Sequence, residues 1–187
     1  MSKEINKIIS ILEEGGVILY PTDTVWGLGC DATNTTAIQK IYKIKKREVN
    51  KPLILLIHDS KRLSNYIKSV PEIANQMIKE VKEPITIIYE QPINLPELLT
   101  SNKTIGIRVV KQNHLKLLLK TFNKPITSTS ANISNSKNPI SFSEIDRYIK
   151  NNVDYIVSES FMCYKSKNKA SKIIKITNNS NIQIIRK

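Results

Sequence analysis

The chain has 187 residues, 40% of them hydrophobic, which is enough to bury one sizeable core, so we expect a single domain covering residues 1–187. Its 29 lysines and arginines against 16 acidic residues give a formal net charge of +13, which suits a phosphate-bearing partner or a lysine-rich solvated surface equally well. The sequence has no apolar run near the roughly 18 residues of a membrane span and no apolar signal-peptide core, so we predict a cytoplasmic protein without a membrane partner.

Helical and strand-like patterns alternate along the chain. In chain order, hydrophobic periodicity predicts a helix at 5–12, a strand at 17–20, a helix at 37–44, a strand at 53–57, helices at 63–67 and 73–81, strands at 85–89 and 104–109, a helix at 115–119, a strand at 126–129, a helix at 145–149, and strands at 155–157, 173–176 and 182–185. This alternation is typical of a mixed α/β fold. No internal repeat or Pro-rich linker indicates a domain boundary.

Small and hydroxyl-bearing residues mark the ends of these elements. Gly15-Gly16 ends the first helix because glycine tolerates left-handed geometry. Pro21 ends the first strand because proline cannot donate to a sheet ladder. Thr35 or Thr36 is placed to cap the second helix. The segments between the elements are therefore polar connections.

Four polar segments contain side chains suited to binding. They are residues 20–30 (YPTDTVWGLGC), Lys45-x-Arg47, Thr104-x-x-x-Arg108 and residues 128–132 (STSAN). Because an α/β sheet delivers its loops to one edge, we expect the four segments to form one site. Fixed positive charge beside hydroxyl and amide groups favours an anionic ligand. Each segment alone also has a plainer interpretation, such as a tight turn or a solvated helix end.

Three residues in these segments raise specific expectations. Gly27 and Gly29 would let the backbone approach a ligand or adopt a positive φ. Arg108 interrupts an apolar strand pattern, and a buried arginine either meets a carboxylate, for which Asp23 is a candidate, or faces an anion in a cavity.

Several common sites are missing from the sequence. His58 and His114 are the only histidines, and neither lies in a nucleophile motif, so no Ser-His-Asp triad is indicated. Cys30 and Cys163 have no partner at ligand spacing, so we predict no protein-bound metal. Walker-type and Gly-x-Gly-x-x-Gly phosphate loops are also absent. Phosphate recognition would therefore depend on individual side chains.

With these residues in order, the chain resembles the YrdC-like family, the threonylcarbamoyl-AMP synthases that act early in tRNA threonylcarbamoyladenosine formation. Residues 20–29 resemble the family's opening signature, and Lys45-x-Arg47 with Ser130-x-Asn132 resembles its Lys-x-Arg and Ser-x-Asn tetrad. The resemblance spans nearly the whole chain. It implies an open twisted mixed sheet with flanking helices around a basic concave cavity.

The resemblance also implies substrates and partners. L-threonine, bicarbonate and ATP would be the substrates, with Mg²⁺ held mainly by the ATP phosphates. Threonine carbamate would attack the α-phosphate, and the protein would hold the two anions together without supplying a nucleophile. The product would pass to the tRNA threonylcarbamoyl-transferase machinery.

The family's roles carry over to individual positions. The residues implied to bind threonine are Thr24, Arg108, Ser130 and Ser171. The residues implied to bind ATP are Arg47, Lys51, Thr104, Asn132, Ser141 and Arg186. The residues implied to be catalytic are Lys45, Arg47, Ser130 and Asn132. Lys45 would serve the phosphates or the carboxylated intermediate.

The sequence departs from the family pattern at several positions. Lys51 stands where many members have Asn, Leu56 where some have a threonine-contacting His, and Ser134-Asn135 where Ser-Gly is common. The chain ends at Lys187, so we expect the short form without an additional C-terminal domain. Residues 163–171, dense in Lys, Ser and Asn, are expected to form a mobile loop or a lid.

Two alternatives remain open at this point. The net charge would also suit a non-catalytic protein that binds double-stranded RNA or tRNA, although aromatic residues make up only 6% of the chain and no RNA-recognition motif is present. The chain could also be a degenerate family member that serves as a scaffold. Retention of the tetrad argues against the scaffold.

Overall fold

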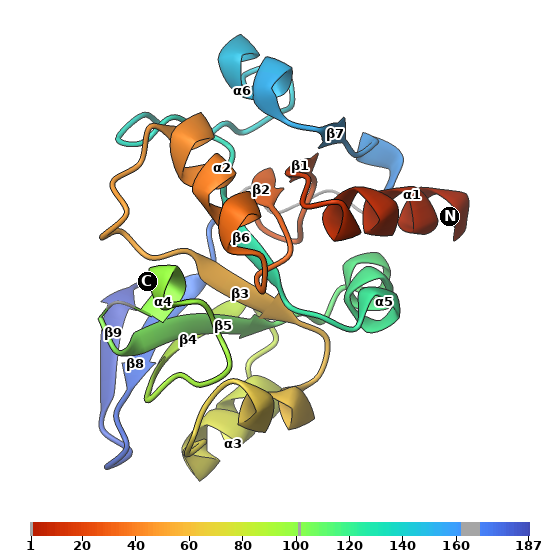
Figure 1. Ribbon diagram of the computed structural model, residues 1–187. Coiled ribbons are helices and arrows are strands. Elements are labelled where there is room, and N and C mark those ends of the chain that lie inside the picture. The colour runs from red at the N-terminus through yellow and green to blue at the C-terminus, as the bar shows by residue number, and fades with distance from the viewer. Residues whose placement is uncertain (1, 101, 162–168) are drawn as a thin grey trace.

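The computed structural model describes residues 2–100, 102–161 and 169–187, and it has the mixed α/β architecture that the sequence predicts (Figure 1). Its α-helices are α1 (Ser2–Glu13), α2 (Thr35–Lys45), α3 (Glu72–Glu80), α4 (Glu97–Thr100), α5 (Asn113–Phe122) and α6 (Arg147–Asn152). Its strands are β1 (Ile18–Tyr20), β2 (Gly27–Gly29), β3 (Ile54–Ile57), β4 (Ile85–Glu90), β5 (Thr104–Val109), β6 (Ile126–Ser130), β7 (Tyr155–Ile156), β8 (Lys172–Ile176) and β9 (Ile182–Arg186). Within these ranges no helix is long and apolar enough to cross a bilayer.

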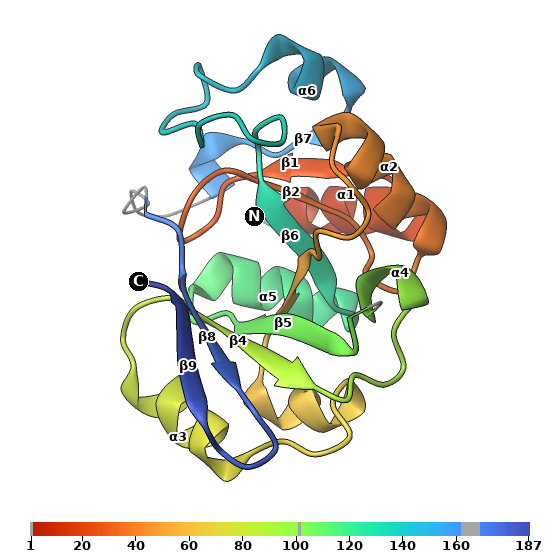
Figure 2. The same cartoon turned by 90° about the vertical axis from the view of Figure 1, so that its left-hand side faces the viewer.

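The strands of the described chain form one open sheet in the order β7-β1-β2-β6-β3-β5-β4-β8-β9. β6 joins the two halves, because it pairs antiparallel with β2 on one side and with β3 on the other. Parallel pairs occur between β1 and β7, β3 and β5, and β4 and β8, so the sheet is mixed. Figure 2 shows β6 passing from the part that contains β1 and β2 toward the part that contains β4, β8 and β9.

Strand residues alternate between two faces of the sheet, and helices cover both faces. On β1, Ile18 and Tyr20 belong to the apolar cluster that contains the buried residues of α1 and α5, whereas Leu19 belongs to the cluster that contains those of α2 and α3. On β3, Leu56 and Leu55 divide between the clusters in the same way. Burial on both faces explains why the strands are continuous apolar runs, and each buried Leu or Ile contributes about 1.5–3 kcal/mol.

The structure corrects two predicted helices. Asn34, rather than Thr35 or Thr36, caps α2, because its side-chain oxygen accepts a hydrogen bond at 3.0 Å from a backbone N–H of the first turn. The segment predicted as a helix at 63–67 is instead a 3₁₀ helix at Ser60–Asn65. The hydrophobic pattern predicted where both helices lie. Their first residues are set by the capping side chains of Asn34 and Asp59.

The strand β2 was not predicted, because the sequence Gly-Leu-Gly was interpreted as part of a loop. The suggested positive φ at Gly27 and Gly29 is wrong: among the described glycines only Gly15 has one, at 74°. Gly29 is required for close packing between strands, since a Cβ there would lie 2.7 Å from the Thr127 carbonyl oxygen and 2.8 Å from the Tyr20 ring. Because Gly29 has no side chain, β2 can pack closely against Tyr20 of β1 and Thr127 of β6.

Candidate active site

A cavity of about 240 Å³ lies where the two halves of the sheet meet. Its walls come from the β1–β2 connection, the segment after α2, strands β3, β5 and β6, and the ends of β8 and β9. Of the residues predicted for the site, those that line it are Thr24, Arg47, Arg108, Ser130, Ser171 and Arg186. The described lining includes these three arginines and no acidic residue, so the cavity is basic, as the resemblance implied.

Arg108 is the most deeply buried cation of the lining, with 3% of its surface exposed. Its Nη1 donates to Thr24 Oγ1 at 3.1 Å, and its Nη2 lies 3.2 Å from Asp23 Oδ1. The Asp23 contact is an ion pair without hydrogen-bond alignment, and among the described residues Arg108 Nε has no partner. Arg108 therefore meets the carboxylate of Asp23, as one of the two expectations had it, and it also lines the cavity.

Thr22 organises the β1–β2 connection, a role that the sequence interpretation missed. Its hydroxyl donates to the Val25 carbonyl at 2.7 Å and accepts from the Thr24 N–H at 3.0 Å. The hydroxyls of Thr22 and Thr24 are also 2.8 Å apart. These bonds fix the turn that places Thr24 beside Arg108. Thr22 was part of the quoted motif, but nothing in the spacing distinguished it from its neighbours.

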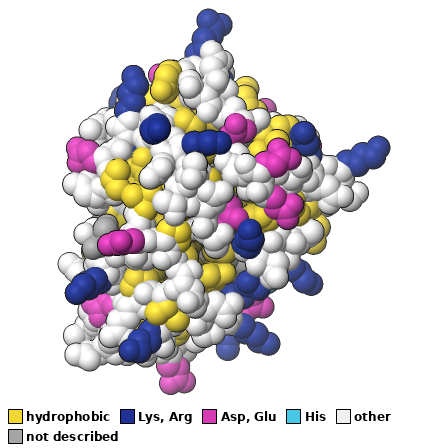
Figure 3. Space-filling model, in the orientation of Figure 1, with side chains coloured by type: hydrophobic (Ala, Val, Ile, Leu, Met, Phe, Trp, Pro, Cys, Tyr) yellow, Lys and Arg dark blue, Asp and Glu magenta, His cyan; other side chains and the backbone are white. Residues whose placement is uncertain are grey.

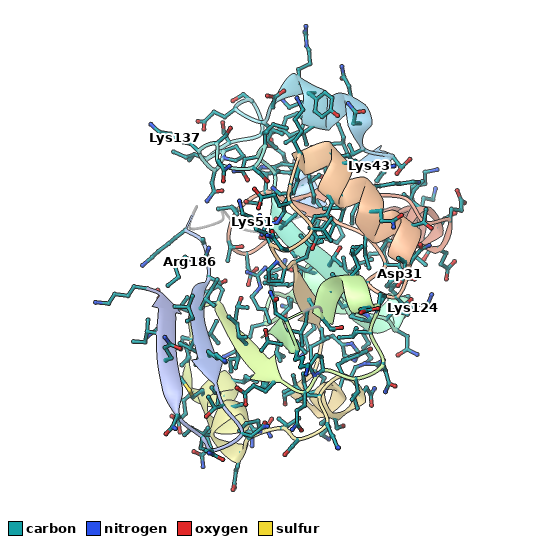
Figure 4. All side chains as sticks on the ribbon, turned by 60° about the vertical axis from the view of Figure 1, so that its left-hand side comes forward. Asp31, Lys43, Lys51, Lys124, Lys137 and Arg186 are labelled. Carbon is teal, nitrogen blue, oxygen red and sulfur yellow. The ribbon has the colours of Figure 1, made fainter. Side chains whose placement is uncertain are left out.

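Arg186 and Ser171 form the wall opposite, where β9 returns alongside β8. Arg186 Nε and Nη2 donate to the Ser171 carbonyl at 3.1 and 2.8 Å, and the Ser171 hydroxyl lies 2.8 Å from that of Thr86. Burial, with the nearby charge of Arg108, lowers the pKa of Arg186. Figure 4 shows Arg186 at the end of β9. The pairing of Ile173 with Arg186 across the two strands sets this position.

Arg47 reaches the cavity because the chain reverses at the end of α2. Lys46 adopts the left-handed conformation, with φ 48°, and the N–H of Arg47 then bonds the Tyr42 carbonyl at 2.9 Å. Arg47 Nε and Nη2 donate to the carbonyls of Lys51 and Pro52 at 3.0 and 3.1 Å. Burial lowers the pKa of Arg47. Two of its nitrogen atoms anchor the guanidinium group at the cavity wall.

Lys45 lies behind the cavity wall rather than in it. Its side chain is among the fully buried ones, at 1% exposure, and burial lowers its pKa to about 7. Its ammonium donates to the carbonyls of Ser130 and Asn132 and, at 3.3 Å, to Asn132 Oδ1. Asn132 Oδ1 also accepts from the Ser130 hydroxyl at 2.6 Å, and Asn132 Nδ2 donates to the Ser136 carbonyl at 2.6 Å. Of Lys45, Ser130 and Asn132, only Ser130 is among the described residues that line the cavity.

The remaining predicted contacts lie outside the cavity lining. Thr104 shares a face of β5 with Arg108, because residues an even number apart on a strand point the same way, but it lies at the far end of that strand. The Lys51 ammonium is 3.6 Å from Glu48 Oε1 in an exposed pair. The Ser141 hydroxyl is 2.8 Å from that of Ser143 in an exposed loop. Ligand contacts at these three residues therefore stay predictions.

The cavity lining also contains a residue that the sequence did not predict. Asn138 lines the cavity and was missed, because a single Asn in a polar connection carries no distinguishing signal.

Of the predicted loop at 163–171, residues 163–168 lie outside the described residues, while Ala170 and Ser171 line the cavity. Across the residues that the structure describes, no three His, Cys, Asp or Glu side chains gather to hold a metal ion.

Comparisons with known proteins identify the family of this chain. The Sua5, YciO and YrdC family model, described as telomere recombination, matches residues 10–187. A threonylcarbamoyl-AMP synthase of Pseudoalteromonas translucida is 35% identical over 155 residues, which cover 81% of this chain and 83% of that protein. P. abyssi Sua5, solved in complex with L-threonine, is 25% identical with a TM-score of 0.82 over 91% of this chain.

The chain covers different fractions of the two solved structures. The present chain covers 50% of the length of P. abyssi Sua5. It covers 90% of E. coli YciO, which matches the whole of this chain with a TM-score of 0.83 and 26% identity. The family model and the fold thus match nearly all of the chain. The chain belongs to the Sua5, YciO and YrdC family.

Proposed function

We propose that this chain is a threonylcarbamoyl-AMP synthase, working as a single domain over residues 1–187. L-Threonine and bicarbonate condense to threonine carbamate and water. A carbamate oxygen then attacks the α-phosphorus of ATP, the bond to the β-phosphate oxygen breaks, and pyrophosphate leaves. The observation that carries the proposal is the single cavity in which Arg47, Arg108 and Arg186 converge with hydroxyl groups.

The two sides of the cavity suit the two substrates. Thr24 and Arg108 form a hydroxyl and guanidinium pair, which matches the carboxylate and hydroxyl of L-threonine, and the Ser171 hydroxyl lies on the opposite wall of the same cavity. Arg47, on the segment after α2, and Arg186, on β9, are placed to hold the triphosphate. Carbamate and triphosphate repel each other, so fixed cations that stabilise both lower the barrier by positioning and charge.

Mg²⁺ would enter this site bound to the ATP phosphates. The described lining supplies guanidinium, hydroxyl and amide groups and no carboxylate, and Asp23 is already paired with Arg108. Oxygen ligands for the ion would therefore come mainly from the nucleotide and from water. Bound in that way, the ion would neutralise charge on the leaving pyrophosphate.

The test is release of pyrophosphate from ATP by the purified chain. We expect release only when L-threonine and bicarbonate are both present, and little when L-serine or glycine replaces threonine. Each substrate is omitted in turn as a control. Release at the same rate without threonine would reject the substrate assignment.

The product's route to tRNA is a further part of the proposal. We infer that the protein works in the cytoplasm and delivers its product to the enzymes that modify tRNA. Figure 3 shows Lys and Arg side chains spread around the visible face instead of gathered over one element, which does not favour RNA binding alone. Salt-sensitive tRNA binding without any ATP turnover would favour the RNA-binding alternative.

A further inference from the structure

The ammonium group of Lys45 is enclosed by oxygen atoms that belong to the protein. Its three acceptors are the carbonyl oxygens of Ser130 and Asn132 and the side-chain oxygen of Asn132. A charged lysine ammonium has three N–H donors and a neutral amine has two, so these three acceptors are enough for every donor in either protonation state. No donor is left for a phosphate unless the existing bonds are broken.

The backbone of Lys45 is held by the same loop. Its carbonyl, at the end of α2, accepts a hydrogen bond from the Ser134 N–H at 2.9 Å. The loop is therefore attached to Lys45 at two places, by its side chain near Ser130 and Asn132 and by its backbone at Ser134. These contacts tie the end of the helix to the loop that carries Ser130 into the cavity wall.

The orientation of the Ser130 hydroxyl depends on this arrangement. Ser130 Oγ donates at 2.6 Å to Asn132 Oδ1, the same oxygen that Lys45 contacts at 3.3 Å. Asn132 Nδ2 is held in turn by the Ser136 carbonyl at 2.6 Å. The lone pairs of the Ser130 hydroxyl are thereby turned to a fixed direction at the cavity, ready to accept a hydrogen bond from a substrate N–H or O–H.

We infer that Lys45 is a positioning residue, whose ammonium group fixes the Ser130–Asn132 turn and does not contact a phosphate. This differs from the phosphate or intermediate contact that the family resemblance implied for Lys45. The lysine acts on the reaction through Ser130 and Asn132. The inference deepens the proposed function and depends on it only for the kinetic measurement described below.

The first experiment uses the unaltered protein and limited acetylation with acetic anhydride, followed by peptide mass spectrometry. Lys43, exposed on the outer side of the same helix, is the internal control (Figure 4). Burial lowers the pKa of Lys45 to about 7, which would make an accessible amine react faster than Lys43. Slow acetylation of Lys45 would therefore report that it is enclosed.

We expect Lys45 to be acetylated at least tenfold more slowly than Lys43, with and without a non-hydrolysable ATP analogue. The inference is overturned if Lys45 reacts as fast as Lys43 in the free protein and becomes protected when the analogue binds. That second pattern is what a phosphate-contacting amine would give. Because no substitution is involved, this result does not depend on whether a variant folds.

The second experiment separates binding from turnover with three methionine variants. Lys45→Met keeps the side-chain length and removes the donors, Arg47→Met removes a cation of the lining, and Lys43→Met is the matched control. Binding of the ATP analogue is measured by calorimetry. Turnover is measured as threonine-dependent pyrophosphate release.

For Lys45→Met we expect the Kd of the analogue to stay within threefold while kcat falls at least tenfold. Arg47→Met should raise the Kd at least tenfold, and Lys43→Met should change neither value by more than twofold. A Kd for folded Lys45→Met that rises as much as that of Arg47→Met would overturn the inference, as would an unchanged kcat. If the unaltered protein releases no pyrophosphate, the proposed function fails, while the acetylation and binding results still decide the role of Lys45.

Discussion

Lys45 and Arg47 stand two positions apart, yet the structure gives them different places. Lys45 is enclosed by carbonyl oxygens behind the cavity, whereas Arg47 lines the cavity. The left-handed backbone at Lys46 separates them, because it turns the chain between the two side chains. Two cations of one short basic motif thus have different surroundings, one among carbonyl oxygens of the protein and one in the cavity wall.

The number of donors explains the division. Lysine has at most three N–H donors, and the Ser130–Asn132 turn supplies an acceptor for each of them. Arginine has five in a rigid fork, so Arg47 can anchor itself through Nε and Nη2 and keep its other group for an anion. Arg186 is anchored in the same way on the Ser171 carbonyl. Arginine therefore suits a cavity wall that must be both fixed and charged.

The largest expected effect is at Arg108, the most buried cation of the lining. Arg108→Gln would leave Asp23 unpaired and remove the cation proposed to hold the threonine carboxylate. We expect threonine-dependent pyrophosphate release to fall at least about a hundredfold, or roughly 2.7 kcal/mol of transition-state stabilisation. Arg62→Gln, which changes a half-buried arginine bonded to Asn123 outside the cavity lining, is the matched control. A loss below threefold at Arg108 would remove it from the threonine site.

Arg47→Ala tests the member of the basic pair that lines the cavity. Loss of a cation from the lining should lower activity at least about tenfold, or roughly 1.4 kcal/mol, and the loss should appear in the response to ATP concentration. Initial rates over a range of ATP concentrations measure it. Near-normal rates would mean that Arg47 has no role toward the phosphates.

The pH dependence of stability tests the enclosed member of the pair. Because burial lowers the pKa of Lys45 to about 7, the folded protein binds fewer protons than the unfolded chain between about pH 7 and the ordinary lysine value. The free energy of unfolding should therefore rise with pH in this window, by less than about 1.4 kcal/mol per pH unit, relative to Lys45→Met. Urea unfolding of both proteins from pH 6 to pH 9 measures the difference. Parallel curves would mean that the lysine stays charged when buried.

Arg186→Lys tests whether activity depends on the two hydrogen bonds from the Arg186 guanidinium group to the Ser171 carbonyl, in addition to its charge. A lysine keeps the positive charge but cannot make the forked contact with the Ser171 carbonyl. We expect activity to fall about fivefold, or roughly 1 kcal/mol. Activity equal to that of the unaltered chain would show that charge alone is sufficient at this position.

The smallest effect is expected at Lys46, which separates the two residues. Glycine adopts φ 48° more easily than lysine does, although Lys46→Gly also removes a contact with the Tyr148 ring. We expect a net gain of about 0.5 kcal/mol in stability, measured by thermal unfolding, with unchanged activity. Lys46→Val is the opposing control, because a β-branched residue disfavours this backbone. A stabilised valine variant would contradict the account of the reversal.

Most of the fold could be predicted from the sequence, because strands buried on both faces must be continuous apolar runs. The run at 53–57 and the alternation at 104–109 gave β3 and β5 within one residue. β2 could not be predicted, since Gly-Leu-Gly lacks the side chains that identify a strand. Its role depends on contacts with Thr127, nearly a hundred positions away.

The site was predictable in composition but not in detail. The Asp23 pairing of Arg108 was anticipated, because a buried arginine needs compensation. The place of Lys45 could not be anticipated, since spacing does not reveal which carbonyl oxygens meet an ammonium group. Thr22 and Asn138 were missed because nothing in the sequence distinguishes them from the polar residues around them. Residue types indicate an anion site, whereas the division between anchoring and binding depends on the folded backbone.

The central claim is that one cavity joins threonine carbamate to the α-phosphate of ATP. The most direct test incubates the chain with L-threonine, ¹⁴C-bicarbonate and α-³²P-ATP and separates the products by chromatography. The account predicts one product that carries both labels in equal amounts and is lost in Arg108→Gln. A ³²P-labelled product that lacks ¹⁴C, or that forms without threonine, would contradict it.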